Sequence, residues 1–236
     1  TCAAYAPLSV IYTDEGRDPE YWWFEKEVDA IVVDETIMAH QPARYLAAGS
    51  LDAIAKFVEV HHNRGAFTPT SVPVDVYAAY HSAATTYELL NLFTEQACAD
   101  VAEGKLTEAV HTVVFCNIAL TGIISSMTRG RGQAALGHSF YNGLKTCFFD
   151  ETHGYKHGEL VGTGLLVQTA FDKNDELRSA VMSLLKKSNL PVTFAELGIT
   201  DKEKGVRKLA DYMENYDGIK DIPEGKERLI AALETL

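Results

Sequence analysis

Three residues of this chain carry the side chains that often hold a catalytic divalent metal. They are Asp52, His138 and His157. A carboxylate with two imidazoles binds such an ion and leaves coordination positions open for a substrate. Each of the three lies in a stretch that the apolar pattern predicts to be buried helix, where a charged or titratable side chain is costly unless it has a partner. The pattern therefore indicates a candidate metal site.

Each of these residues also has a simpler structural explanation. A single histidine on an apolar helix face is more often a hydrogen-bonded core residue than a ligand, and the same holds for His81 and His111. Asp52 falls in the first turn of an expected helix, where the helix dipole stabilises a carboxylate by about 0.3–1 kcal/mol. Spacing alone leaves both explanations open.

Small residues accompany both histidines of the candidate site. They are Gly137, Asn142 and Gly143 around His138, and Gly158, Gly162 and Gly164 after His157. Glycine allows a backbone or a ligand to approach closely. We interpret the glycine-lined start of the helix at His157 as a surface built for a ligand.

Composition limits the classes of function. The chain has 236 residues, of which 47% are hydrophobic, so it can bury a sizeable core as one domain or two. A net charge of -12 argues against nucleic acid, because phosphate recognition needs clustered Lys and Arg. No apolar run approaches the roughly 20 residues of a membrane span, so we expect no membrane role. The first five residues do not resemble a signal peptide.

The four cysteines, Cys2, Cys98, Cys116 and Cys147, form no CxxC pair and no short-spaced framework. In a chain of this size they are typical of reduced thiols in a cytoplasmic protein. Cys98 and Cys116 lie in apolar helical stretches and are expected to be small buried hydrophobes. The chain begins with Thr1, already in strand-like sequence, which suggests an excised fragment or a processed chain.

The sequence pattern changes from strand-like to helical near residue 34. Short runs at 8–12, 21–24 and 30–33 are rich in aromatic and β-branched residues and predict strands. Three strands alone make a marginal unit. We therefore expect residues 1–34 to be a β segment left from a larger α/β domain, and residues 35–236 to form a mainly helical domain.

Helical periodicity runs through the rest of the chain. We predict a short helix over 42–48 that is broken at Gly49, and a second helix over 51–61 that Ser50 caps. Pro73 should open a long helix to about Val101. Further helices are expected over 107–125 (apolar on most faces and therefore central), 133–146, 157–171, 175–187, 202–214 and 226–236, and residues 193–196 fit a capping box.

Three segments also carry a resemblance that covers essentially the full chain: residues 1–12, 42–52 and 138–158. Together they resemble the later two-thirds of the glycerol dehydrogenase branch of the iron-containing alcohol dehydrogenase superfamily. The resemblance implies a nucleotide-binding α/β domain coupled to a helical, dehydroquinate synthase-like catalytic domain, with the metal in the cleft between them. The family's ligands, one Asp and two His, fall on Asp52, His138 and His157.

Two departures from the family pattern bear on metal and substrate. Iron-type members carry a further histidine four residues after the aspartate, where this chain has Lys56. This favours Zn²⁺ over Fe²⁺ or another divalent ion. Glycerol dehydrogenases begin the first segment with Thr-Asp-Ala-Pro, whereas this chain has Thr1-Cys2-Ala3-Ala4. The substrate then shifts from glycerol toward 2-oxo acids, because this start is similar to the hydroxycarboxylate dehydrogenase A type.

The resemblance also implies roles for other residues. Cofactor contacts are expected from Thr1, Cys2, Leu8 and Tyr12. The residue types and positions further suggest substrate contacts from Cys2, Arg129, Arg131 and His153, although a solvated basic turn is the more common role for the two arginines and a surface loop an equally common one for His153. Arg is suited to a substrate carboxylate because it pairs with one through two hydrogen bonds.

These expectations describe a metal-dependent oxidoreductase that interconverts an alcohol, polyol or 2-hydroxy acid and its carbonyl compound. The metal acts as a Lewis acid and hydride passes to or from NAD or NADP. We also expect a homo-oligomer. No glycine-rich dinucleotide fingerprint occurs, since the stretch 128–132 lacks a preceding strand. The chain alone is therefore expected to bind NAD(P) weakly or not at all.

Two other classes of function remain. The chain could be a non-catalytic helical module, or an inactive remnant, that assembles with a separate nucleotide-binding chain, and an exposed apolar face on the β segment would support this. A helical metal-dependent hydrolase is disfavoured, because such enzymes usually add further His and Asp ligands and the chain has no His-Asp dipeptide.

Overall fold

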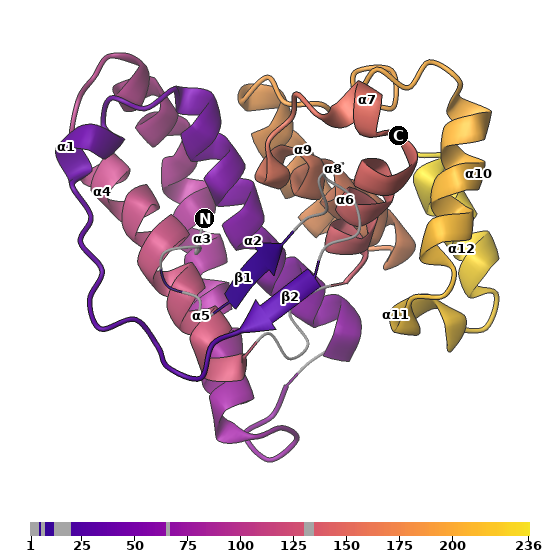
Figure 1. The fold of residues 1–236 in the computed structure, drawn as a ribbon, viewed down its shortest axis with the longest axis horizontal. Coiled ribbons are helices and arrows are strands. Elements are labelled where there is room, and N and C mark those ends of the chain that lie inside the picture. Colours follow the sequence, from indigo (N-terminus) through magenta and orange to yellow (C-terminus); the bar gives the residue numbers. More distant parts are fainter. Residues whose placement is uncertain (1–4, 6–7, 12–19, 65–66, 130–134) are drawn as a thin grey trace.

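The computed structural model describes residues 5, 8–11, 20–64, 67–129 and 135–236. Helices dominate it and lie in two groups, with α1 to α5 on one side of Figure 1 and α6 to α12 on the other. Helices α2 and α8 pack against each other where the two groups meet. The mainly helical class predicted from the sequence is confirmed.

Two short strands precede the helices. Strands β1 (Leu8–Ile11) and β2 (Glu20–Trp23) form an antiparallel pair in which Leu8 faces Trp23 and Ile11 faces Glu20. The third predicted strand, over 30–33, is wrong: this stretch is irregular and leads to α1 (Glu35–Met38), whose first N–H groups are capped by Asp34. An isolated apolar run cannot become a strand without a neighbour for its backbone groups. The domain boundary at residue 34 stays a prediction.

Helix α2 is longer than the sequence pattern suggested. It runs without a break over Ala43–Arg64, so the predicted interruption at Gly49 and the predicted N-cap at Ser50 are wrong. Ser50 instead donates a hydrogen bond to the Leu46 carbonyl oxygen one turn back. A Cβ at Gly49 would lie 2.9 Å from Asn117 Nδ2. The glycine is thus explained by a close neighbour and not by the end of a helix.

The next helix along the chain, α3, packs against a second long helical stretch. Helix α3 (Val74–Ala102) follows Pro73 as predicted, and α4 (Glu108–Phe115), the π-helical segment η2 (Cys116–Leu120) and α5 (Thr121–Thr128) pack along it. Glu108–Thr128 is one continuous stretch with a mean hydropathy of 1.6 over 18 residues, long and apolar enough to cross a membrane. The expectation that no run approaches that length was wrong. Half of this window is buried inside the fold.

The second group is built around α8 (His157–Phe171), which is buried on almost every side. Its bounds, and those of α9 (Asp175–Lys187), agree with the sequence prediction. The other helices of this group are α6 (Leu136–Cys147), α7 (Phe149–Thr152), α10 (Lys202–Met213), α11 (Asp217–Lys220) and α12 (Gly225–Leu233).

The expected capping box at 193–196 does not begin a helix. Glu196 N donates to Thr193 Oγ1 at 3.2 Å, but the Glu196 carboxylate accepts from Val192 N instead of from Thr193 N. Gly198 follows with a φ of 82°. The segment is therefore a turn that uses the same side chains as a helix cap.

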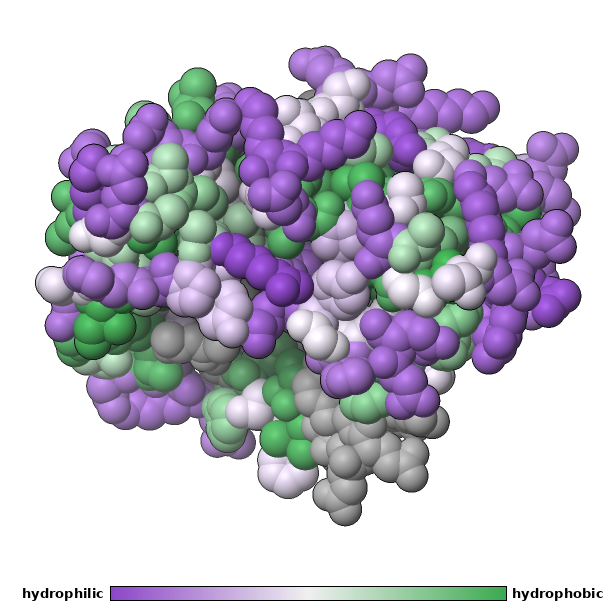
Figure 2. All heavy atoms as spheres, turned by 90° about the horizontal axis from the view of Figure 1, so that it is seen from above, coloured by the Kyte–Doolittle hydropathy of each residue, from purple (hydrophilic) through white to green (hydrophobic). Residues whose placement is uncertain are grey.

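The surface is mostly hydrophilic on the face shown in Figure 2, with hydrophobic residues in smaller patches. Large aromatic side chains are exposed on strand β2 and just after it. Tyr21, Trp22, Trp23 and Phe24 are between 42% and 58% exposed, so this aromatic segment has little cover from the described residues. Large exposed apolar patches often mark an interface.

Candidate metal centre

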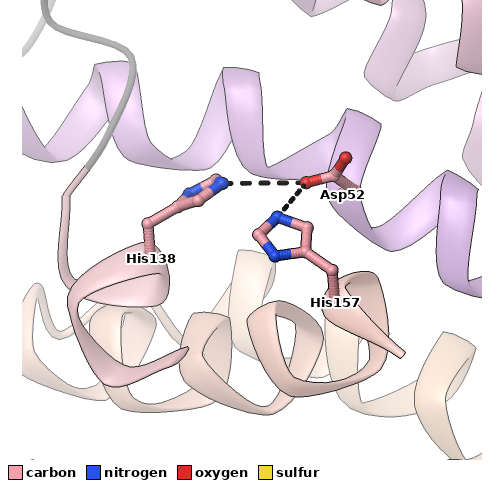
Figure 3. Close-up of side chains that lie close together, drawn as sticks. All are labelled: Asp52, His138 and His157. Atoms are coloured by element: carbon pink, nitrogen blue, oxygen red, sulfur yellow. Dashed lines mark ion pairs between the residues drawn. The ribbon is translucent and has the colours of Figure 1, made fainter. Parts of the chain in front are cut away.

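Asp52, His138 and His157 come together from three helices. Asp52 lies on α2, about two and a half turns after the helix begins. His138 lies in the first turn of α6, and His157 is the first residue of α8. Figure 3 shows both imidazoles pointing toward the Asp52 carboxylate. The expectation that Asp52 lies in a first turn was wrong, so the dipole of its own helix does not explain it.

The distances within this cluster suit a small cation. Asp52 Oδ1 lies 3.2 Å from His157 Nε2 and 3.7 Å from His138 Nε2, and one ligand atom from each residue lies within 4.8 Å of the others. Ligand atoms about 2.0–2.2 Å from a tetrahedral Zn²⁺ lie about 3.4 Å apart. The cluster therefore fits an ion of this size.

Glu59 fixes the direction in which His138 faces. Its Oε2 lies 2.6 Å from His138 Nδ1, and its Oε1 accepts hydrogen bonds from the backbone N–H groups of Ala135 and His138, both at 2.9 Å. The side chain is fully buried on α2, two turns after Asp52. With Nδ1–H donated to Glu59, the free lone pair of His138 lies on Nε2, which faces Asp52.

Glu59 also supplies a missing helix cap. The residue at the N-cap of α6 is Ala135, whose side chain cannot accept a hydrogen bond. Glu59 Oε1 takes this role from α2, and Gln168 Oε1 on α8 accepts from the N–H groups of Leu136 and Gly137 at 3.1 and 3.4 Å. The first turn of α6, which carries His138, is thus held by both neighbouring helices.

Glu59 is not among the residues singled out from the sequence, although the sequence contains a signal for it. A glutamate seven residues after Asp52, inside the apolar run Phe57–Val60, lies on the same helix face as Asp52. Gln168 gave no comparable signal, because a single amide in an apolar helix is compatible with many environments.

The start of α8 is attached to the start of α2. Arg44 pairs with Glu159 through Nε and through Nη2, the latter at 2.8 Å from Oε2, and the Glu159 side chain is fully buried. Glu159 Oε2 also accepts from Lys156 N at 2.8 Å. Tyr141 of α6 places its ring edge-on to His157, with the ring centroids 4.3 Å apart. These contacts hold His157 opposite Asp52.

The glycines near the histidines make room for neighbouring helices, and this corrects our interpretation of a glycine-lined ligand surface. A Cβ at Gly158 would overlap the Ala48 carbonyl oxygen of α2. A Cβ at Gly164 would lie 2.6 Å from Gly137 O of α6, and one at Gly162 would lie 2.8 Å from Leu51. Because α8 approaches α2 and α6 this closely, its histidine reaches the other two residues.

The charges of the cluster are coupled. Burial disfavours the ionised form of Asp52, but His157 and His138 outweigh burial and hold the pKa of Asp52 well below its ordinary value. Burial likewise opposes ionisation of Glu59, and His138 with two backbone N–H groups keeps the pKa of Glu59 lowered. For His138, burial lowers the pKa, but Glu59 and Asp52 together raise it to about 9. Two carboxylates thus attract a cation to this place, either a proton or a metal ion.

The other residues singled out from the sequence lie elsewhere or outside the described part. Thr1, Cys2, Tyr12 and Arg131 are outside the described residues. Leu8 lies in β1 and is partly buried. Arg129 is exposed at the end of α5 with a φ of 46°, and the exposed His153 contacts Phe149 and the Asp150 carbonyl oxygen. Their roles toward cofactor and substrate stay predictions.

No family model matches the chain. It is, however, 36% identical to a glycerol dehydrogenase from Pseudomonas putida over 218 residues, which covers 89% of this chain and 58% of that protein. It is 31% identical to hydroxycarboxylate dehydrogenase A from Escherichia coli over 199 residues, which covers 84% of this chain and 54% of that protein. The chain thus spans little more than half the length of these relatives.

The fold agrees with the sequence relatives. The crystal structure of glycerol dehydrogenase from Schizosaccharomyces pombe superposes with a TM-score of 0.81 at 25% identity, over 99% of this chain and 60% of that one. Almost every residue of this chain therefore has a structural counterpart in that dehydrogenase.

Proposed function

We propose that this chain, a homologue of glycerol dehydrogenases and of hydroxycarboxylate dehydrogenase A, contributes the metal site of an NAD(P)-linked alcohol dehydrogenase. The observation that supports this best is the meeting of Asp52, His138 and His157 from three helices, with Glu59 holding His138 in the tautomer that a metal requires. The reaction is the interconversion of an alcohol, either a polyol or a 2-hydroxy acid, with its carbonyl compound.

The chemistry of the donor set supports a divalent ion. Asp52 is ionised, and each histidine directs Nε2 toward Asp52 Oδ1. Three protein ligands from one carboxylate and two imidazoles are typical of zinc in an enzyme, since they leave one position for a substrate. Zinc is proposed over iron because Lys56 stands where iron-type members of the superfamily have a further histidine.

The residues of the chain have distinct tasks in this proposal. A bound divalent ion supplies Lewis acidity toward the substrate oxygen, and a nicotinamide cofactor supplies or accepts the hydride. Asp52 and the two imidazoles hold that ion in place. Glu59 keeps His138 Nδ1 protonated and His138 Nε2 free. Arg44 and Glu159 fix the helix start that carries His157.

A second function stays open because one observation favours it. The exposed aromatic segment Tyr21–Phe24 is the feature expected of a helical module that assembles with a separate nucleotide-binding chain. An inactive remnant has no need for a carboxylate and two imidazoles at coordinating distances, so the cluster favours the catalytic proposal. Retained metal distinguishes the two.

Activity is best tested in a chimera. The part of the Pseudomonas putida glycerol dehydrogenase outside the match is joined to this chain, and the product is assayed with polyols and 2-oxo acids, with NAD(H) and NADP(H), before and after chelation. We expect turnover that chelation abolishes and added Zn²⁺ restores, and none in the His157→Ala variant. A chimera that is folded and zinc-loaded but inactive toward all these substrates would contradict the proposed function.

A further inference from the structure

Lys56 lies on the same face of α2 as the two carboxylates of the site. Successive residues of an α-helix are about 100° apart, so Lys56 is about 40° to one side of Asp52 and Glu59 is about 20° to the other. Helical side chains lean toward the N-terminus of their helix. Lys56 is therefore a neighbour of Asp52 on this face, one turn further along α2.

The positive charge of Lys56 has no protein partner in the part of the chain that the structure describes. Lys56 is partly buried, and among the described residues no carboxylate lies within ion-pair distance of it. The Asp52 carboxylate faces the two histidines, and both Glu59 oxygens are occupied by His138 and the start of α6. Lys56 nonetheless acts on the site, because its charge opposes protonation of His138.

A count of formal charges shows what the site lacks. A divalent ion and Lys56 contribute three positive charges, whereas Asp52 and Glu59 contribute two negative ones, and the metal-bound histidines are neutral. The site then carries one net positive charge. A substrate with a single negative charge neutralises it, and an uncharged polyol does not.

We propose that Lys56 binds the carboxylate of an anionic substrate, so that the site prefers a 2-oxo acid or its 2-hydroxy acid over an uncharged polyol. This inference rests on the metal site proposed above and names the substrate class for it. A lysine ammonium is a point charge on a flexible stem, and it can follow a carboxylate attached to the carbon that bears the reacting oxygen. Arg129, which the sequence offers for the same task, is exposed at the end of α5.

The test compares a carboxylate with its uncharged amide. The chain is loaded with Co²⁺, whose visible absorption reports a change of ligands, and is titrated with lactate and with lactamide. In the wild-type chain we expect lactate to bind at least tenfold more tightly than lactamide. Lys56→Gln should remove this preference while the chain still takes up Co²⁺ at saturating metal, whereas Lys56→Arg should keep most of it. Lys204→Gln, an exposed lysine on α10, is the matched control and should behave like wild type.

The outcomes separate this inference from the proposed function. A wild-type chain that takes up no Co²⁺ or Zn²⁺ overturns both. A metal-loaded chain that does not distinguish lactate from lactamide, or whose preference survives in Lys56→Gln, overturns the role of Lys56 and leaves the metal site standing.

Discussion

His138 Nδ1 lies 2.6 Å from Glu59 Oε2, and this contact determines what the other nitrogen of the ring can do. Because Nδ1–H donates a hydrogen bond to a fully buried carboxylate, Nε2, which faces Asp52, is the nitrogen that can bind a metal once it has lost its own proton. The same carboxylate caps the helix that carries His138. Glu59, which would not contact the metal itself, therefore sets the orientation of His138, which would.

Replacing Glu59 with Gln should weaken metal binding and leave the fold in place. The amide keeps a hydrogen bond but lowers the electron density on His138. Loss of the carboxylate that hydrogen-bonds a metal-binding histidine costs about 10–100-fold in metal affinity. Competition with a chromophoric chelator measures the change. Asp172→Asn is the matched control. Asp172 Oδ1 lies 2.6 Å from Nδ1 of His62, a second histidine-carboxylate pair. His62 is on α2, like Glu59, but this pair is outside the Asp52 cluster. Equal zinc affinity in wild type and Glu59→Gln would contradict the role given to Glu59.

Adding a methyl group at Gly158 should disturb both stability and metal binding. The new Cβ would overlap the backbone oxygen of Ala48, which cannot move without shifting α2. We expect Gly158→Ala to lower the free energy of unfolding by about 3 kcal/mol and to weaken zinc binding, because His157 moves with the helix start. Urea denaturation with and without zinc measures both effects.

The control for this substitution is close by in sequence. Among the described residues other than its two chain neighbours, no heavy atom lies within 4 Å of the Cβ position at Gly154, so Gly154→Ala should leave the unfolding midpoint and the zinc affinity at their wild-type values. Unchanged stability in Gly158→Ala would mean that α8 and α2 are not in backbone contact as described.

Metal binding should grow stronger as the pH rises toward 9. Without metal, Glu59 and Asp52 outweigh the effect of burial and raise the pKa of His138 to about 9. Below that pH the proton must leave before Nε2 can bind a metal ion, so the apparent affinity should rise by about tenfold per pH unit between 7 and 9 and then level off. Calorimetry in buffers of different ionisation enthalpy counts the released proton. An affinity that is constant from pH 7 to 9 would contradict this coupling.

Cys116, which is buried, and Cys98, which is partly buried, should react slowly. Burial raises the pKa of Cys98 and of Cys116 to about 11 each. At pH 8 their thiolate fraction is roughly 240-fold below that of an ordinary cysteine with a pKa near 8.5, so alkylation should be slower by at least that factor. Mass spectrometry after iodoacetamide treatment, native and in guanidinium, measures the difference. Labelling of either residue in the native chain as fast as free glutathione would show that it is not buried.

The sequence predicted elements well where one local signal dominated. Helices α8 and α9 begin and end where the apolar period and the polar boundaries indicated, and Pro73 marks the start of α3. The same local signals failed at Gly49 and Ser50, because the cost of glycine in a helix is offset there by the approach of Asn117 from a distant segment. The three site residues could be named from the sequence, but their helix positions could not all be assigned.

The supporting contacts were harder to foresee. Glycines next to His138 and His157 looked like space for a ligand, yet Gly158 and Gly164 are the points where three helices touch. The Glu59 cap of α6 joins residues 76 positions apart in the chain. Contacts of this range depend on how the helices pack, which a pattern of neighbouring residues does not contain.

The account depends most on whether Asp52, His138 and His157 share one metal ion. X-ray absorption at the zinc edge of the metal-loaded chain tests this directly. We predict one zinc per chain with two imidazole nitrogens at about 2.0–2.1 Å and oxygen ligands at about 2.0–2.2 Å, and loss of one imidazole in His157→Ala. A sulfur shell near 2.3 Å, or a spectrum that His157→Ala leaves unchanged, would contradict the proposed site.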